Sequence, residues 1–258
     1  MLAKMKDWAL EVGELQRDYF RSTYKVSNKK EKINLVTEVD QKSEKILLNK
    51  IRNNFPADKI LAEESGNITG DSLETGRWWI IDPLDGTVNY VHGFHIFGIS
   101  LAFLIDGKLD KAVVYIPMLE EMYEAQRQGG SFINGEKMEL KDNKDLSRAV
   151  IATGFPYDHQ SNSQDIIDMF SQVLPLVGGI RRTGSAAFDL CQVARGVFDG
   201  FWEVRLSPWD IAAGALIISE AGGVVTNFSG EEIQYNAAEI VAGNRFINQE
   251  LRQVLEGE

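Results

Sequence analysis

Two aspartates stand three residues apart, directly after a run of large apolar residues. The run Trp78-Trp79-Ile80-Ile81 is typical of a buried strand because its residues are bulky and partly β-branched. Asp82-Pro83-Leu84-Asp85 follows at once, and charge beside a buried strand is costly unless it is paired or binds a metal. Mg²⁺ prefers oxygen ligands, so the pattern predicts a divalent-cation site. The competing interpretation is an acidic surface turn of common composition.

Gly86 and Thr87 come immediately after this acidic turn. They offer backbone N–H groups at an expected helix start, where a phosphate is readily bound. A segment where the backbone can approach a ligand closely is expected at Gly178–Ala187, which leads into a helix over residues 186–194. Tight packing between a helix and a strand explains these small residues equally well.

Three more carboxylates stand at the ends of predicted elements. Glu63 follows the short apolar run Ile60–Ala62, and Asp210 falls in the first turn of a helix that starts after Ser207. Asp40 stands three residues after Thr37, a spacing that resembles a capping box. Helix capping accounts for Asp40, and the helix dipole accounts for Asp210. Neither aspartate needs a catalytic role on spacing alone.

Amphipathic helices and antiparallel strands are expected to position these groups. Apolar residues at helical spacing predict a first helix that ends near Ser22 and a second from Thr37 to about Phe55. The charged segment Ser27–Lys32 between them is predicted to be a loop. Hairpin signals favour a mostly antiparallel sheet up to about residue 137. Its expected strands include residues 96–105, 109–116 and 122–127.

The polar connection Asp142–Asp145 is the predicted boundary between subdomains 1–142 and 143–258. The second part is expected to hold strands at residues 149–153, 200–205, 224–225 and 239–242. Its helices are predicted at residues 163–173, 186–194, 208–222 and 248–255.

Length and composition exclude several classes of protein. The chain has 258 residues, 44% of them hydrophobic and 25% charged, which is ordinary for a globular protein. Its net charge of −11 argues against a nucleic-acid binder. Cys191 is the only cysteine, so an internal disulfide is impossible. With neither a signal peptide nor an apolar run of roughly 20 residues, we expect a soluble cytoplasmic protein without a membrane partner.

Taken together, the motifs resemble those of the inositol monophosphatase family of Mg²⁺-dependent, Li⁺-sensitive phosphatases. The resemblance rests on Ala62–Ser65, Trp79–Asn89 and Pro208–Gly214, and it extends to Asn34–Asp40 and Arg181–Ala187. It therefore covers nearly the whole chain. It implies an α+β fold, a layered αβαβα sandwich of the inositol monophosphatase and fructose-1,6-bisphosphatase type. It also implies a homodimer.

The resemblance implies a set of ligands for two or three Mg²⁺ ions. Glu63, Asp82 and the Leu84 carbonyl would bind the first ion, while Asp82, Asp85 and Asp210 would bind the second. Two such ions lower the pKa of water and stabilise the entering and leaving oxygens of a phosphoryl transfer. No covalent nucleophile is then required.

The remaining roles follow from the same resemblance. Thr87, with Glu63, would orient and activate the attacking water, and Asp40 would support Thr87. Gly86 and Thr87 N–H groups would hold the phosphate, with Asp85 beside it. Glu203 and the backbone of Gly184, Ser185 and Ala186 would contact the hydroxyls of the substrate alcohol. Lys29, or Lys30, matches a loop lysine that reaches the metal site in the family.

The predicted activity is hydrolysis of a small phosphorylated substrate, with myo-inositol monophosphate first. Arg205 keeps other substrates open, because two positions after Glu203 it shares the expected strand face and offers a guanidinium to a second phosphate. Fructose-1,6-bisphosphatase, NADP phosphatase and histidinol-phosphatase activities are therefore alternatives. A salt bridge at the surface or at a subunit interface explains Arg205 equally well. A non-catalytic or moonlighting interaction protein with the same fold is the hypothesis from a different class.

Overall fold

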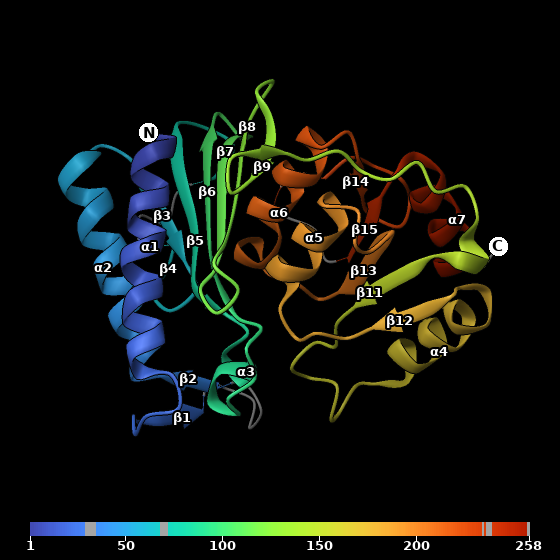
Figure 1. Cartoon of the computed structure of the whole chain (residues 1–258), viewed down its shortest axis with the longest axis horizontal. Helices are drawn as coiled ribbons and strands as arrows, with labels where there is room; N and C mark the ends of the chain where they lie inside the picture. The colour runs from blue at the N-terminus through green and yellow to red at the C-terminus, as the bar shows by residue number, and fades with distance from the viewer. Residues whose placement is uncertain (29–34, 68–71, 234, 236–238, 257–258) are drawn as a thin grey trace.

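The structure is a computed structural model that describes residues 1–28, 35–67, 72–233, 235 and 239–256. Its elements stack in five layers (Figure 1). Helices α1 (Leu2–Tyr19) and α2 (Glu38–Asn54) form one outer layer against an eight-stranded sheet. Helices α5 (Ala186–Ala194) and α6 (Pro208–Glu220) separate that sheet from a five-stranded one. Helices α4 (Gln164–Val173) and α7 (Arg245–Leu255) close the far side. The expected αβαβα sandwich is confirmed.

The eight-stranded sheet has the order β10-β9-β8-β7-β6-β5-β3-β4. Its neighbours pair antiparallel except β3 and β5, which are parallel, so the predicted antiparallel sheet is confirmed. The strands are β3 (Lys59–Ala62), β4 (Gly66–Asn67), β5 (Arg77–Asp85), β6 (Gly98–Ile105), β7 (Lys108–Ile116), β8 (Glu121–Gln126), β9 (Gly130–Ile133) and β10 (Glu136–Lys137).

The five-stranded sheet has the order β12-β11-β13-β15-β14 and mixes parallel and antiparallel pairs. Its strands are β11 (Val150–Thr153), β12 (Gly179–Arg181), β13 (Gly200–Val204), β14 (Val224–Thr226) and β15 (Glu239–Gly243). Three short elements complete the structure: α3 (Thr87–Val91) and the 3₁₀ turns η1 (Leu146–Arg148) and η2 (Leu174–Leu176).

The prediction of a loop over Ser27–Lys32 is wrong in part. Strand β1 (Val26–Asn28) pairs antiparallel with β2 (Leu35–Thr37), so Ser27 and Asn28 are extended rather than in a loop. All three β1 residues are exposed, and their pairing runs through the backbone, so side-chain polarity gave no sign of it. Lys29 and Lys30, named as alternative site lysines, lie outside the described residues.

The predicted helix boundaries are close to the observed ones. The first helix ends at Tyr19 rather than near Ser22. Helix α7 begins at Arg245, three residues earlier than predicted, because Asn244 caps it by accepting a hydrogen bond from the Ile247 N–H at 2.9 Å. Helix α5 spans the predicted residues.

Strand β5 lies between two cores. Trp78 and Ile80 point toward the layer of α5 and α6, whereas Trp79 and Ile81 point toward α1 and α2. All four side chains are at most 1% exposed, as expected for a strand covered on both faces. The core around α5 and α6 includes residues of both sheets, so the two parts of the chain share it. The division at residue 142 stays a prediction.

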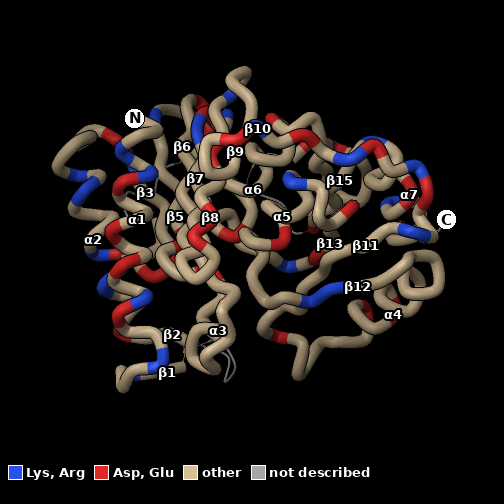
Figure 2. Tube along the Cα trace, viewed as in Figure 1, with Lys and Arg blue, Asp and Glu red and all other residues tan. Residues whose placement is uncertain are grey.

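Charged residues are distributed over the outer elements. In the view of Figure 2, Lys and Arg are scattered among Asp and Glu along the described chain. Among the described residues, no helix is both long enough and apolar enough to cross a membrane.

Candidate metal centre

A β-bulge at the end of β5 directs two aspartates to the same side. Asp82 pairs with Ser100 of β6 and Asp85 with Gly98, so three steps on β5 match two on β6. In a regular strand, residues three apart point to opposite faces, and one extra residue brings them to the same face. Pro83 has no N–H to donate to the ladder, which suits such an irregularity. The local strand defect therefore brings Asp82 and Asp85 together.

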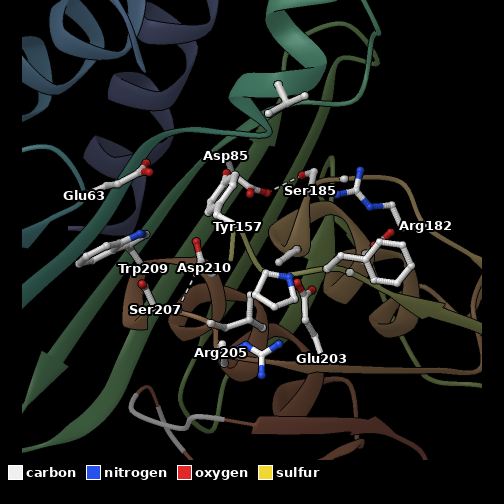
Figure 3. A pocket seen from close by; sticks show the side chains of 18 residues that line it. Glu63, Asp85, Tyr157, Arg182, Ser185, Glu203, Arg205, Ser207, Trp209 and Asp210 are labelled. Carbon is white, nitrogen blue, oxygen red and sulfur yellow. Dashed lines mark hydrogen bonds between the residues drawn. The ribbon is translucent and has the colours of Figure 1, made fainter. Parts of the chain in front are cut away.

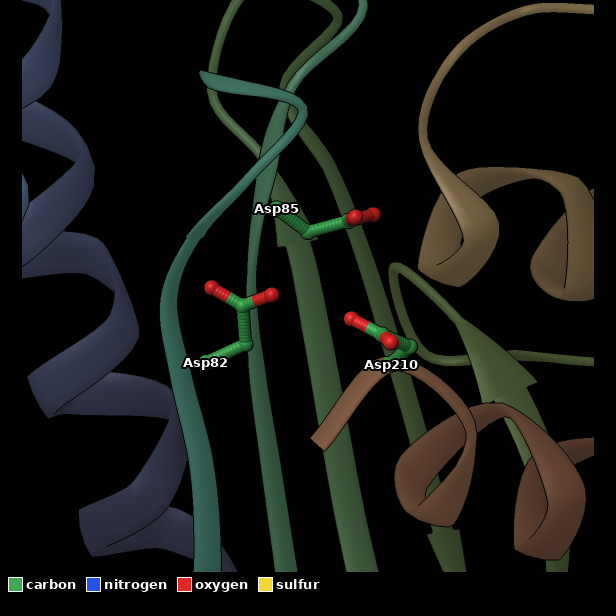
Figure 4. Close-up of side chains that lie close together, drawn as sticks. All are labelled: Asp82, Asp85 and Asp210. Atoms are coloured by element: carbon green, nitrogen blue, oxygen red, sulfur yellow. The ribbon is translucent and has the colours of Figure 1, made fainter. Parts of the chain in front are cut away.

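The third aspartate comes from a distant part of the chain. Asp210 stands in the first turn of α6, where its Oδ2 accepts a hydrogen bond from the Ser207 N–H at 2.6 Å in a capping box. Figure 4 shows the side chains of Asp82, Asp85 and Asp210 entering the space between β5 and α6. One oxygen from each of the three lies within 4.8 Å of the other two. The helix cap and the cluster member are the same residue.

Each carboxylate of this cluster is fixed by the chain around it. Asp82 Oδ1 accepts from the Leu84 N–H at 2.9 Å, and Glu63 is near enough to raise the pKa of Asp82. Asp85 Oδ2 accepts from the Ser185 hydroxyl and from the Ala187 N–H at 2.9 Å, at the start of α5. These contacts link the eight-stranded sheet to α5. They also hold the aspartates close together against the repulsion between their charges.

Thr87 and Asp40 form a buried pair beside the cluster, as predicted. Thr87 Oγ1 lies 2.8 Å from Asp40 Oδ1 and 3.1 Å from the Leu84 carbonyl oxygen. Asp40 also accepts from the Thr37 N–H at 2.9 Å, completing the capping box of α2. Gly86 has φ of +89°, a conformation that glycine adopts without the strain a side chain brings. The two proposed roles of Asp40, capping and supporting Thr87, coexist.

Burial and mutual repulsion make the charged forms of these groups costly. Burial is the main cause that raises the pKa of Asp82 well above its usual value, with Glu63, Asp85 and Asp210 adding to it. Burial also raises the pKa of Asp85 to about 6, although its hydrogen bonds to Ser185 and Ala187 oppose the rise. The pKa of Asp40 is raised mainly by burial, and its bonds to Thr37 and Thr87 again oppose the shift.

The donor set fits a hard divalent cation. Its ligand atoms are carboxylate oxygens, which Mg²⁺ prefers over nitrogen or sulfur ligands. A cation between Asp82, Asp85 and Asp210 would offset the repulsion among their charges. Glu63 lines the same cleft as Asp85 and Asp210, and the Leu84 carbonyl accepts a hydrogen bond from Thr87 beside them.

A cleft of about 210 Å³ opens above the cluster, between the two parts of the chain. Glu63, Asp85 and Asp210 line its inner end, and Glu203 and Arg182 lie further along it (Figure 3). This size suits a small molecule.

Glu203 lines the cleft, and its contact with a substrate stays a prediction. It stands on β13, is 6% exposed and lines the cleft. Burial is the main cause that raises its pKa well above the usual value, Asp210 and Asp189 add to the rise, and Arg182 opposes it. Its carboxylate occupies the space beside Gly154, where a Cβ atom would lie 2.2 Å from Glu203 Oε1.

Gly184, Ser185 and Ala186 line the same cleft as Glu203, and their predicted contact with the substrate alcohol stays a prediction. The Ser185 hydroxyl makes two hydrogen bonds: it donates to Asp85, and it caps α5 by accepting from the Phe188 N–H at 3.3 Å. Gly184 has φ of +87°, and a Cβ there would lie 2.9 Å from Asn89 Oδ1. This segment is therefore both closely packed and part of the cleft wall.

Arg205 lines the cleft with Glu203, but not through the strand alternation that was predicted. Strand β13 ends at Val204, and Arg205 has φ of +59°, so strand alternation no longer relates its side chain to that of Glu203. Its Nε lies 3.1 Å from Asp158 Oδ1 and its Nη1 2.5 Å from Asp165 Oδ2. Figure 3 places Arg205 at the opposite end of the view from Asp85. A salt bridge, the simpler of the two explanations, is what the structure contains.

Several cleft residues were not predicted from the sequence, among them the titratable residues Tyr157, Arg182 and Asp189. Tyr157 lies in a loop without a motif, and Arg182 stands next to a glycine-rich segment that drew attention to its backbone only. Asp189 is 2% exposed on α5 and accepts from Thr183 Oγ1 at 2.7 Å. Asp189 could have been recognised from the sequence as a candidate, because a carboxylate inside an otherwise apolar helix needs a partner.

Comparison with known proteins adds the ancestry of the chain. A sequence model described as the inositol monophosphatase family matches residues 1–256. The chain belongs to this family. It is 40% identical over 242 residues to a protein named Nus factor SuhB from Pseudomonas aeruginosa, covering 92% of this chain and 88% of that protein.

Solved structures of the inositol monophosphatase family have the same fold. The extragenic suppressor protein suhB from Bartonella henselae matches with a TM-score of 0.90 and 37% identity, covering 99% of this chain and 98% of that one. An inositol monophosphatase from Anabaena matches with a TM-score of 0.88 and 35% identity, covering 99% and 94%. Relatives in this family thus carry two kinds of name, one enzymatic and one not.

Proposed function

We propose that this protein is a Mg²⁺-dependent phosphomonoesterase that hydrolyses myo-inositol monophosphate to inositol and phosphate. The observation that carries the proposal is the convergence of Asp82, Asp85 and Asp210, with oxygens within 4.8 Å of one another, at the inner end of a small cleft. Family membership supports the same reaction class. The paired Thr87 and Asp40 beside the cluster supply a place for water.

The residues divide the work according to their position. Glu63, Asp82 and the Leu84 carbonyl would hold one Mg²⁺, and Asp82, Asp85 and Asp210 a second. When bound, the ions supply Lewis-acid stabilisation of the phosphate oxygens and lower the pKa of water.

Thr87 and the N–H groups around it orient the reactants in this proposal. The Thr87 hydroxyl has one hydrogen, and when it is engaged by Asp40 Oδ1 its lone pairs accept a hydrogen bond from the attacking water. Glu63 accepts a second hydrogen bond from that water. The N–H groups of Gly86 and Thr87 donate to the phosphate oxygens. Helix α3 has only five residues, so these local donors contribute more than the helix dipole does.

Glu203 and the Gly184–Ala186 segment would bind the alcohol. A carboxylate accepts hydrogen bonds from neighbouring hydroxyls, and Glu203 is positioned along the cleft from the aspartate cluster. The guanidinium of Arg205 is already engaged by Asp158 and Asp165, which argues against its binding a second phosphate of the substrate.

Other phosphate esters stay open as substrates. A solved structure with 26% identity and a TM-score of 0.88, covering 99% of this chain and 95% of its own, is titled an IMPase/NADP phosphatase complexed with NADP and Ca²⁺. A staphylococcal inositol monophosphatase-1, also 26% identical with a TM-score of 0.88, is titled a LiCl-soaked inhibitory complex. These titles support testing NADP as a substrate and Li⁺ as an inhibitor of this chain.

Phosphate release with Mg²⁺ tests the proposal. The substrate panel is myo-inositol 1-phosphate, fructose 1,6-bisphosphate, NADP and histidinol phosphate, with Asp85→Asn as the inactive control. We expect release from inositol 1-phosphate by the wild type, loss of it in Asp85→Asn, and inhibition by millimolar Li⁺. Equal and negligible release by both proteins from all four substrates would remove the enzymatic proposal.

The name Nus factor favours a second, non-catalytic function, because it specifies no hydrolytic reaction. The prediction that nucleic acid is not a partner therefore needs its own test. Titration of the protein into labelled RNA and DNA at physiological salt measures it directly. Strong binding together with an inactive substrate panel would favour the interaction hypothesis over the phosphatase.

Three further predictions stay with the proposal. The number of Mg²⁺ ions, two or three, is measured by isothermal titration calorimetry. The homodimer is tested by light scattering coupled to gel filtration. Location in the cytoplasm is tested by fractionation of cells that make the protein.

A further inference from the structure

Arg205 holds the segment that forms one wall of the cleft. Its Nε contacts Asp158, its Nη1 contacts Asp165, and its Nη2 donates to the Asn162 carbonyl at 3.1 Å. All three partners lie within eight residues of one another, between β11 and the first turn of α4. One guanidinium thus fixes the far end of the segment 154–165.

The near end of that segment reaches the aspartate cluster through Tyr157. Residues 154–157 all line the cleft. The Tyr157 side chain is 42% exposed, yet its pKa is raised, first by burial of the phenol group and then by Glu63, Asp210, Asp85 and Asp82. Tyr157 therefore lines the same cleft as Glu63, Asp85 and Asp210 while part of its surface is open to solvent.

Figure 3 shows the same arrangement, with Tyr157 drawn beside Asp85 in this view and Arg205 at the lower end. The phenol lines the cleft together with Asp85 and Asp210. A phosphate held at the cluster would lie in this same cleft. The phenol is the neutral hydrogen-bond donor placed there.

We propose that the Tyr157 hydroxyl donates a hydrogen bond to the phosphate ester of the bound substrate, and that Arg205 positions Tyr157 through the segment 154–165. This inference rests on the proposed phosphatase function. It assigns Tyr157 to the phosphate, which every substrate shares, and not to the alcohol. Arg205, whose guanidinium is engaged by Asp158 and Asp165, acts as a positioning residue.

The experiment compares Tyr157→Phe, Arg205→Met and their double variant on two substrates. Myo-inositol 1-phosphate carries ring hydroxyls, whereas p-nitrophenyl phosphate has none. Loss of one hydrogen bond to a charged phosphate is expected to lower kcat/KM about 10- to 100-fold in Tyr157→Phe, by a similar factor for both substrates. Arg205→Met should lower it more than about twofold, with little further loss when Tyr157 is already Phe.

Controls separate this role from a loss of structure. Arg195→Met removes a comparable surface salt bridge, 2.5 Å to Glu121 and away from the cleft, and should leave kcat/KM within about twofold. If Arg205→Met does not fold, Asp165→Asn weakens the same contact from the other side. Effects of Tyr157 and Arg205 that multiply independently would overturn the positioning role. A Tyr157→Phe enzyme equal to wild type on both substrates would overturn the phosphate contact.

Failure of the proposed function is distinguished by the wild-type measurement. If the wild type releases phosphate from neither substrate, binding of inorganic phosphate with Mg²⁺ is measured by calorimetry. Weaker binding to Tyr157→Phe than to wild type then supports the contact without any turnover. Equal binding by the two proteins, or no binding by either, overturns it.

Discussion

Replacing Asp82 with asparagine is expected to stabilise the metal-free protein. Two full charges 4.8 Å apart repel by about 3 kcal/mol at an effective dielectric constant of 20, and Asp82 has Asp85, Asp210 and Glu63 near it. Proton binding by these carboxylates relieves part of the repulsion, as the raised pKa values of Asp82 and Asp85 show. For Asp85, a pKa of about 6 in place of 3.8 corresponds to roughly 3 kcal/mol. An asparagine keeps the oxygen that accepts from the Leu84 N–H, so we expect a net gain of about 2 kcal/mol.

Thermal unfolding at pH 7.5 measures this gain. In chelator, a gain of about 2 kcal/mol raises Tm by roughly 4–8 °C for a chain of this size. Added Mg²⁺ should raise Tm of the wild type and leave Asp82→Asn nearly unchanged, since binding to the folded state stabilises it by mass action. Asp142→Asn, at an exposed surface pair with Lys144, is the control and should change neither value. An Asp82→Asn protein that melts below wild type in chelator and still responds to Mg²⁺ would refute the reasoning.

Three further predictions concern the same region. Because the pKa of Asp85 is raised to about 6, the destabilising cost of its charge is fully present above pH 6 and is lost as the pH falls toward 4. The Mg²⁺-induced rise in Tm should therefore be smaller at pH 5.5 than at pH 7.5. An equal rise at the two pH values would contradict this. Thr87→Val leaves Asp40 Oδ1 without its donor and should cost about 1–3 kcal/mol by denaturant unfolding and most of the turnover, whereas Thr87→Ser should retain both. Gly154→Ala displaces the Glu203 carboxylate, so KM should rise for inositol 1-phosphate while p-nitrophenyl phosphate is hydrolysed as before.

The sequence was most informative where chemistry and local geometry coincide. The apolar run before Asp82 predicted a buried strand, which the burial of Trp78 and Trp79 confirms. The capping positions of Asp40 and Asp210 were also predictable, because caps depend on residues three apart. The bulge that brings Asp82 and Asp85 to one side was visible only as Pro83, since a register shift depends on the partner strand.

Contacts between distant segments could not be predicted in the same way. Ser185 was selected as a small residue near the substrate, but its bond to Asp85 joins residues 100 positions apart. Strand alternation placed Arg205 beside Glu203, and it failed because the strand ends one residue earlier with a left-handed backbone. The partners of Arg205, from Asp158 to Asp165, follow no spacing rule. Such contacts depend on how the layers stack, which local pattern does not encode.

The position of the cluster has a consequence for how the layers hold together. Asp82 and Asp85 belong to the first sheet, Asp210 to α6, and Asp85 is bonded to the start of α5. Without a cation, repulsion between Asp85 and Asp210 acts to separate β5 from the central helices, and the Ser185 and Ala187 bonds oppose it. With a cation, the same carboxylates attract a common centre and the sign of their contribution reverses. Metal binding at this site should therefore tighten the packing of β5 against the central helices. The cleft lies along this junction, so the substrate would meet a stiffer wall in the metal-loaded protein than in the metal-free one.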